Sequence, residues 1–162
     1  MIITEICPED IAQCAEIYNY YVLNTRITLE EEAVSVSEFS ARVQRITKKY
    51  PYIVAKEGEK VIGYAYLDVF NPRSAYKITA DLSIYTDKDH THEGIGKKLL
   101  DELCSRAKTM KIEKIVSLVT AENAGSLGFH RKNGFTEQGR LADVAFKLGR
   151  YCDLVFMEKS LL

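Results

Sequence analysis

The segment from Ile84 to Leu100 holds the residues best suited to bind a ligand, because an apolar strand, a polar turn and a glycine-started helix follow one another there. The first turn of a helix offers unpaired backbone N–H groups and the positive end of the helix dipole. Glycines at 94 and 96 leave room for a pyrophosphate to approach that backbone. The pattern favours a site for a phosphorylated cofactor, although Gly-x-Gly also caps helices where no ligand binds.

Two other sets of residues could carry chemistry, and neither has the required spacing. His90 and His92 alternate within the turn, but no carboxylate or cysteine arrangement stands at ligand spacing, so we expect no metal. The four cysteines lack a CxxC pair, which favours reduced thiols over a disulfide framework or a zinc site. They are Cys7, Cys14, Cys104 and Cys152.

Length and composition limit the class of protein. The 162 residues, of which 46% are apolar, are expected to form one domain over 1–162. A net charge of -1 argues against strong nonspecific binding to nucleic acid. Residues 1–5 lack the pattern of a signal peptide, and no apolar run approaches the roughly 20 residues that span a bilayer. We therefore expect a cytoplasmic protein with no nucleic-acid or membrane partner.

Hydrophobic periodicity places the elements that must position the glycine turn. Helices are predicted from Pro8 to Asn24, from Ser37 through Ile46, from Gly94 to about Met110, and from Asn123 to Asn133. Strands are predicted over 2–6, 50–56, 61–67, 76–86, 112–119, 135–138 and 151–157, with 50–56 and 61–67 forming a hairpin. The expected fold is α/β (α+β), a mixed sheet flanked by helices with β-α-β packing around strand 112–119.

Several short motifs occur in a fixed order over nearly the whole chain. They are Ile17-Tyr18-Asn19-x-Tyr21, Tyr50-Pro51-Tyr52-Ile53-Val54-Ala55, Gly63-Tyr64-Ala65-Tyr66, Arg73-Ser74-Ala75-Tyr76, the glycine turn, Asn123-x-x-Ser126 and His130-x-x-x-Gly134-Phe135. Together they resemble the GNAT N-acetyltransferase superfamily, and within it the phosphinothricin acetyltransferase-like branch. The resemblance implies a mostly antiparallel sheet in which two neighbouring strands splay apart around acetyl-CoA, an amine acceptor that enters from the opposite side, and a homodimer.

The resemblance also implies which residues contact acetyl-CoA. Backbone groups of Ile84, Tyr85 and Thr86 would pair with the pantetheine arm. Backbone N–H groups in the turn would hold the pyrophosphate; these belong to His92, Glu93, Gly94, Ile95, Gly96 and Lys97. Asn123 and Ser126 would lie beside the cofactor arm, although Asn123 also suits a helix N-cap. Thr91 and Glu93 depart from the family pattern, and Glu93 is expected to weaken binding rather than abolish it.

Catalytic and acceptor-binding residues follow from the same resemblance. Asp81 stands where the branch commonly has Glu and would act as a base, directly or through water. His130 would donate a proton to the departing sulfur or steer the substrate. Four further residues are expected at the acceptor pocket, with Lys147 in a late loop near a partner subunit. They are Thr28, Glu30, Arg73 and Tyr76.

The function implied is direct transfer of an acetyl group from acetyl-CoA to the amine of a small amino acid-like substrate, of the phosphinothricin, methionine sulfone or methionine sulfoximine type. Two enzymatic alternatives are acetylation of a protein N-terminus or of a polyamine. A polyamine pocket would be rich in carboxylates, whereas an amino-acid pocket would offer a cation such as Arg73. A noncatalytic acyl-CoA-sensing module is the alternative from another class.

Overall fold

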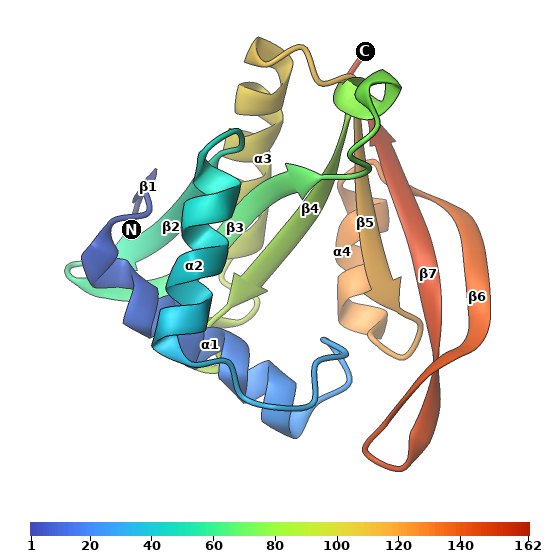
Figure 1. The fold of residues 1–162 in the computed structure, drawn as a ribbon, viewed down its shortest axis with the longest axis horizontal. Helices are drawn as coiled ribbons and strands as arrows, with labels where there is room; N and C mark the ends of the chain where they lie inside the picture. Colours follow the sequence, from blue (N-terminus) through green and yellow to red (C-terminus); the bar gives the residue numbers. More distant parts are fainter.

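The structure, a computed structural model, describes residues 1–162 as a seven-stranded sheet with helices on both faces (Figure 1). The strands are β1 (Ile2–Glu5), β2 (Tyr52–Glu57), β3 (Lys60–Val69), β4 (Thr79–Thr86), β5 (Lys114–Thr120), β6 (Thr136–Lys147) and β7 (Arg150–Ser160). The α-helices are α1 (Ile11–Asn24), α2 (Val36–Thr47), α3 (Ile95–Thr109) and α4 (Ala124–Lys132), with short 3-10 turns η1 (Pro8–Asp10), η2 (Ser74–Ile78) and η3 (Lys88–His90).

The strands run in the order β1-β2-β3-β4-β5-β7-β6. Every neighbouring pair is antiparallel except β4 and β5, which are parallel and connected through α3. The predicted mixed, mostly antiparallel sheet with one β-α-β unit is confirmed. None of the helices combines the length and the apolar character needed to cross a bilayer.

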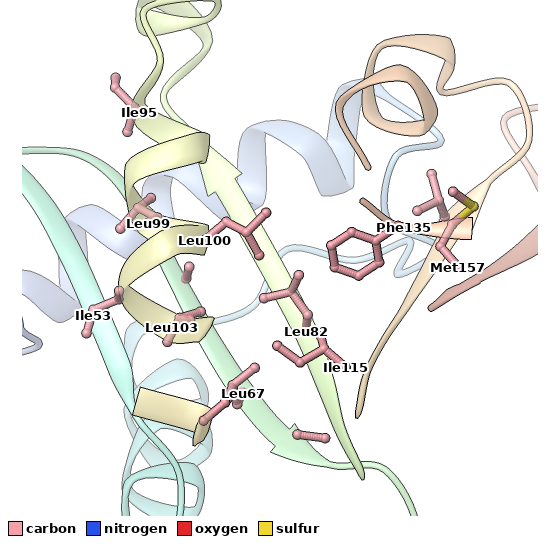
Figure 2. Packing of buried hydrophobic residues seen from close by; sticks show 14 of the residues in the cluster. Ile53, Leu67, Leu82, Ile95, Leu99, Leu100, Leu103, Ile115, Phe135 and Met157 are labelled. Carbon is pink, nitrogen blue, oxygen red and sulfur yellow. The ribbon is translucent and has the colours of Figure 1, made fainter. Parts of the chain in front are cut away.

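Alternating side chains of β3 and β4 separate the two faces of the sheet. Ala65, Leu67 and Leu82 belong to the core beneath α3, where Leu99, Leu100 and Leu103 of the helix pack against them (Figure 2). Each fully buried leucine contributes about 1.5 to 3 kcal/mol of hydrophobic stabilisation. The alternate residues face α1 and α2 and form a second core rich in tyrosine.

Several predicted boundaries differ from the structure, and three of the differences have a clear cause. The strand predicted from Tyr76 begins only at Thr79, because residues 74–78 form the turn η2. Helix α2 begins at Val36 rather than at Ser37, since the Ser35 hydroxyl caps it by accepting a bond from the Glu38 N–H. The strand predicted over 135–138 extends to residue 147 as β6, whose pairing with β7 is interrupted by two register shifts.

Candidate active site

The predicted cofactor cleft corresponds to the place where β4 and β5, the parallel pair, separate. The two strands pair over three residues only, and the last pair is Asp81 with Val116. Both strands continue beyond it, to Thr86 and Thr120, but apart from one another (Figure 1). Leu118, on this part of β5, is 44% exposed. The splayed strands predicted for the cofactor cleft are therefore present.

The segment that joins α1 to α2 crosses the wide end of this cleft (Figure 1). The Arg26 guanidinium donates to the backbone oxygens of Lys147 and Leu148 at 2.9 and 2.6 Å, at the turn between β6 and β7. In return, the buried Lys147 ammonium donates to the Thr28 oxygen at 2.6 Å. Arg26 also lies 3.8 Å from Glu122, just before α4. These contacts tie the segment to the β5 side of the cleft, at the β6–β7 turn and just before α4.

The N-terminus of α3 presents free backbone donors on the face of the sheet opposite α1 and α2. Gly94 is the N-cap residue, with φ of 77°, and no side chain caps the helix. Lys98 is the first residue whose N–H bonds back into the helix, to the Gly94 oxygen, so the N–H groups of Ile95, Gly96 and Lys97 have no intrahelical acceptor. Such a terminus favours an anion through its free donors and its dipole.

Close packing of glycines positions that terminus. A Cβ on Gly96 would meet the Phe129 ring of α4 at 3.4 Å, and one on Gly63 of β3 would meet Ile95 at 3.1 Å. The helix start is thus held between β3 and α4, beside the C-terminal end of β4. Side chains of the turn make other contacts: Glu93 lies 3.2 Å from His90 Nδ1, and Lys97 is paired with Asp101 at 2.7 Å. These two side chains are engaged within the turn and the helix.

Asn123 and Ser126 form the start of α4. The Asn123 side chain accepts a bond from the Ser126 N–H at 3.1 Å, so Asn123 is the N-cap. Its amide nitrogen has no hydrogen-bond partner in the protein and remains a free donor. The Ser126 oxygen accepts a bond from His130 one turn later, which ties the two residues into one arrangement.

His130 is buried, with 6% of its surface exposed, between the rings of Phe129 and Phe135. Nδ1 lies 2.7 Å from the Ser126 backbone oxygen and must carry a proton to donate to it. Burial lowers the pKa of His130, so the ring is neutral near pH 7 and Nε2 is an acceptor. Nε2 is buried without a hydrogen-bond partner. The geometry favours an acceptor at Nε2 over a proton donor.

Asp81 lies at the narrow end of the cleft, on the face covered by α1 and α2. It is partly buried, and no cation forms an ion pair with it. Burial, and then the neighbouring Asp68, raise the pKa of Asp81 to about 6. A carboxylate with such a pKa is ionised at pH 7 and binds a proton more tightly than an ordinary aspartate.

Thr28 and Glu30 lie over the tyrosine-rich face but are bound to protein partners. Thr28 is buried and its hydroxyl is 3.0 Å from Tyr18 Oη. Glu30 forms an ion pair with Arg42 of α2. Both residues therefore fix the segment between α1 and α2 in addition to any contact with an acceptor.

Arg73 and Tyr76 are not near Thr28 and Glu30. They lie in and before η2, at the N-terminal end of β4, whereas Thr28 lies near Tyr85 at the C-terminal end. Both are exposed, and Tyr76 packs against Phe70. The four residues predicted for the acceptor pocket thus form two pairs at opposite ends of β4, with Asp81 between them.

Comparison with known proteins identifies this arrangement. A family model described as an acetyltransferase (GNAT) domain matches residues 3–156. The chain belongs to the GNAT acetyltransferase family. The predicted membership and the predicted fold are both confirmed, and the chain is that of an acetyltransferase.

Individual GNAT proteins match over most of their length. A phosphinothricin N-acetyltransferase of Alcaligenes faecalis is 34% identical over 94% of this chain and 79% of that protein. An L-methionine sulfoximine/L-methionine sulfone acetyltransferase of Pseudomonas aeruginosa is 32% identical over 94% and 90%. The structure of a Sinorhizobium meliloti phosphinothricin acetyltransferase in complex with acetyl-CoA superposes with a TM-score of 0.94 and 35% identity, covering 98% of this chain and 87% of that one.

Another GNAT structure carries a different name. The crystal structure of a ribosomal-protein-alanine N-acetyltransferase from Brucella melitensis has a TM-score of 0.95 and 32% identity, covering 99% of both chains. The shared fold therefore includes proteins named for small-molecule and for protein acceptors.

Two charged residues near the candidate site were not predicted from the sequence. Arg42 and Arg45 of α2 lie over the tyrosine-rich face of the sheet, where they form ion pairs with Glu30 and Asp68. The only sequence signal is the alternation Tyr64, Tyr66, Asp68, which places Asp68 on the same face as the tyrosines.

Proposed function

We propose that this GNAT protein transfers an acetyl group from acetyl-CoA to the amine of a small amino acid-like acceptor, of the phosphinothricin, methionine sulfone or methionine sulfoximine type. The observation that carries the proposal is the position of Asp81. This uncompensated carboxylate lies where β4 and β5 separate, with the α3 terminus at one face of the sheet and the tyrosine-rich face at the other. Relatives named for acetylation of such substrates, at 32–34% identity, support the acceptor class.

Acetyl-CoA would lie across the cleft and meet the α3 terminus. Its pyrophosphate would accept bonds from the N–H groups between His92 and Lys97, where Gly94 has no Cβ to obstruct it. The edge of β4 at Ile84, Tyr85 and Thr86, which does not pair with β5, would pair with the pantetheine arm, and the free Asn123 amide would donate to it. The Thr86 oxygen already accepts a bond from the Tyr21 hydroxyl. The chain offers backbone donors and an open strand edge, which suit a long, polar, phosphorylated ligand.

Asp81 would take a proton from the acceptor ammonium, directly or through one water. The neutral nitrogen then attacks the thioester carbonyl carbon to form a tetrahedral adduct, and the carbonyl re-forms as the C–S bond breaks. The nitrogen gives up its second proton and the CoA thiolate takes up one proton, so the products are the N-acetyl compound and CoA thiol. Presenting a neutral amine whose pKa is about 2 to 3 units above the working pH costs roughly 3 to 4 kcal/mol. A base already fixed beside the amine reduces that cost. No covalent acetyl-enzyme is required.

His130 would act through Nε2. The neutral ring can accept a hydrogen bond from the acceptor amine or from a water at the reacting centre, while Nδ1 remains bound to the Ser126 oxygen. This bond fixes the orientation of the ring before the substrate binds. Less entropy is therefore lost when Nε2 and the substrate amine are brought together.

The acceptor pocket would lie beneath the segment between α1 and α2. Tyr66 lies diagonally across from Asp81 on β3, and Tyr85 lies two positions further along the same face of β4, beyond Ser83. Arg42 of α2 is paired with Glu30 over this face. An amino acid-like acceptor would place its amine at Asp81 and its carboxylate toward a cation, for which Arg42 and the exposed Arg73 are candidates. Both signs of charge at one pocket favour a zwitterion over a polyamine.

Acetylation of a protein N-terminus is the second candidate, supported by the likeness to the ribosomal-protein-alanine acetyltransferase. An acyl-CoA-sensing module would bind acetyl-CoA without turnover. Measuring thiol release from acetyl-CoA across amino acids, their sulfone, sulfoximine and phosphinate analogues, polyamines and short peptides separates these candidates. We expect the highest kcat/KM with an amino acid-like amine. Preference for peptides would favour the second candidate, and saturable acetyl-CoA binding with no thiol release would favour the sensor.

We also propose a homodimer. Large apolar side chains are exposed on the β6–β7 hairpin, and covering them with a second copy would remove apolar surface from water. They are Leu141, Val144, Phe146, Leu148 and Tyr151. Analytical ultracentrifugation tests this, and a monomer at micromolar concentration would contradict it. The single-domain organisation, the cytoplasmic location and the absence of a metal or nucleic-acid partner stay predictions.

A further inference from the structure

A second carboxylate lies directly opposite Asp81. Asp68 of β3 is its register partner on β4, so both side chains project from the same face of the sheet. Directly opposed residues have Cβ atoms about 4.5 to 5.5 Å apart. Asp68 is held in one orientation, because Arg45 of α2 donates to its two oxygens at 3.0 and 2.8 Å and the Val69 N–H donates at 2.8 Å.

This geometry places a fixed negative charge beside the candidate base. The Arg45 guanidinium donates to both oxygens of Asp68 and offsets part of its charge. A carboxylate this close disfavours the ionised form of Asp81, and Asp68 is the second cause, after burial, that raises the pKa of Asp81. The effect of Asp68 on Asp81 therefore depends on how firmly Arg45 holds it.

Other charged groups on this face are paired among themselves. Lys114 of β5 is bound to Glu158 of β7 at 3.0 Å, and Arg42 of α2 is bound to Glu30. Tyr66, between Asp68 and the tyrosine core, is neutral, since burial raises its pKa. The charged groups next to Asp81 on this face are therefore its register partner Asp68 and Arg45, which binds Asp68.

We propose that Asp68, held by Arg45, is a positioning residue that sets the pH range over which Asp81 accepts a proton from the acceptor amine. This inference rests on the proposed role of Asp81 as the base. Asp68 does not touch the reacting atoms. Its charge makes Asp81 a stronger base at pH 7, and Arg45 limits that effect so that Asp81 remains ionised.

The same ion pair would also connect α2 to the sheet, so the test needs a readout that a structural role does not change. The acidic limb of the pH profile, where kcat/KM falls as the pH is lowered, is such a readout. A loss of stability lowers activity, but it does not shift this limb in opposite directions when a negative and a positive charge are removed. Arg140 and Asp153 provide a matched control pair with bonds of 2.7 and 2.5 Å. The side chains of this pair are 54% and 21% exposed, against 57% and 19% for Arg45 and Asp68.

The experiment measures kcat/KM by thiol release from pH 4.5 to 9, on the best acceptor. Asp68→Asn is expected to move the acidic limb to lower pH by about half to one pH unit, since the neighbouring charge is removed but was partly screened. Arg45→Gln is expected to move it to higher pH, because Asp68 loses its counter-charge. Asp68→Glu should keep the wild-type limb, and so should Arg140→Gln. Opposite shifts in the first two variants support the proposal.

Failure of this inference is distinguishable from failure of the proposed function. If Asp81→Asn is inactive but Asp68→Asn and Arg45→Gln keep the wild-type limb, or move it in the same direction, Asp68 does not tune the base and the proposal is overturned. If Asp81→Asn keeps full activity, the proposed function of Asp81 fails first. Carbon-13 NMR titration of the Asp81 carboxyl group, in the wild type and in Asp68→Asn, tests the coupling without turnover. An unchanged titration midpoint would also overturn the inference.

Discussion

Asp81 and Val116 form the last backbone pair between β4 and β5, so the candidate base lies at the point where the two strands separate. On one side of this point the strands form a continuous sheet with the α3 core beneath it. On the other side, strand edges are open to a ligand. One residue is therefore within reach of both the cofactor cleft and the acceptor face, which is the arrangement that direct acetyl transfer requires.

Replacing Asp81 with Asn is expected to stabilise the protein at neutral pH. The folded pKa of Asp81, about 6, lies above the ordinary value of 3.8, so ionisation costs stability once the pH rises through this window. Removing the charge should raise the free energy of unfolding by about 1 to 3 kcal/mol at pH 7.5 and by little near pH 4. Urea denaturation of both proteins at the two pH values measures the gain.

Asp153→Asn is the control for that trend. The pKa of Asp153 is lowered, first by its bond from the Asp143 N–H and then by Arg140. Its contribution to stability is present above the unfolded pKa and is lost as the pH falls, so this variant should be destabilised at pH 7.5. The same pH trend in both variants would contradict the assignment of opposite environments.

Gly94→Ala tests whether the α3 terminus binds the cofactor. Gly94 has a φ of 77°, a conformation that costs an alanine about 1 to 2 kcal/mol, and a Cβ there meets no protein atom within 4 Å. We expect lost stability together with weaker acetyl-CoA binding by calorimetry. Gly58→Ala, at a φ of 59° in the β2–β3 turn, carries the same strain and should leave binding unchanged. Equal effects of the two variants on binding would place the pyrophosphate elsewhere.

Glu93→Gln should strengthen acetyl-CoA binding. The Glu93 carboxylate lies just before the α3 terminus, where a negative charge repels the pyrophosphate. An interaction of about 0.3 to 1 kcal/mol corresponds to a roughly two- to fivefold lower Kd, and the gain should shrink as salt is added. Glu16→Gln, on the exposed face of α1, controls for the change in net charge. Unchanged or weaker binding in Glu93→Gln would show that the carboxylate does not face the anion.

His130→Phe isolates the buried Nε2. Phenylalanine fills the space between Phe129 and Phe135 but supplies no acceptor. We expect kcat to fall by about 10- to 100-fold, the size of one lost hydrogen bond to the reacting groups, while the Kd for acetyl-CoA stays within about twofold. Stopped-flow thiol release and calorimetry separate the two quantities. A wild-type kcat would assign His130 to packing alone.

Local patterns predicted the helices and most strands, because apolar spacing follows the core. Leu99, Leu100 and Leu103 mark the buried face of α3, and the structure places them there. β6 escaped prediction beyond residue 138, since most of its side chains are exposed and register shifts break the alternation. β6 is held by its pairing with β7, and this pairing produces no alternation of apolar and polar residues in the sequence.

The site divides in the same way. The glycine turn is local and could be predicted from the residues, and Asp81 and His130 followed from family resemblance. The Arg45–Asp68 pair joins a helix to a strand across 23 residues, so only the packing of α2 on the sheet brings it together. Arg73 and Thr28 lie at opposite ends of β4, and this separation follows from the position of β4 in the sheet, which the local sequence does not reveal.

The most direct test of the central claim, that Asp81 is the base for acetyl transfer from acetyl-CoA to an amino acid-like amine, is the pH dependence of kcat/KM in the wild type and in Asp81→Asn. The wild type should lose activity with an acidic limb near pH 6. Asp81→Asn should be about 10²- to 10⁴-fold slower, lack that limb, and bind acetyl-CoA with unchanged affinity. A variant with wild-type activity and the same limb would contradict the account.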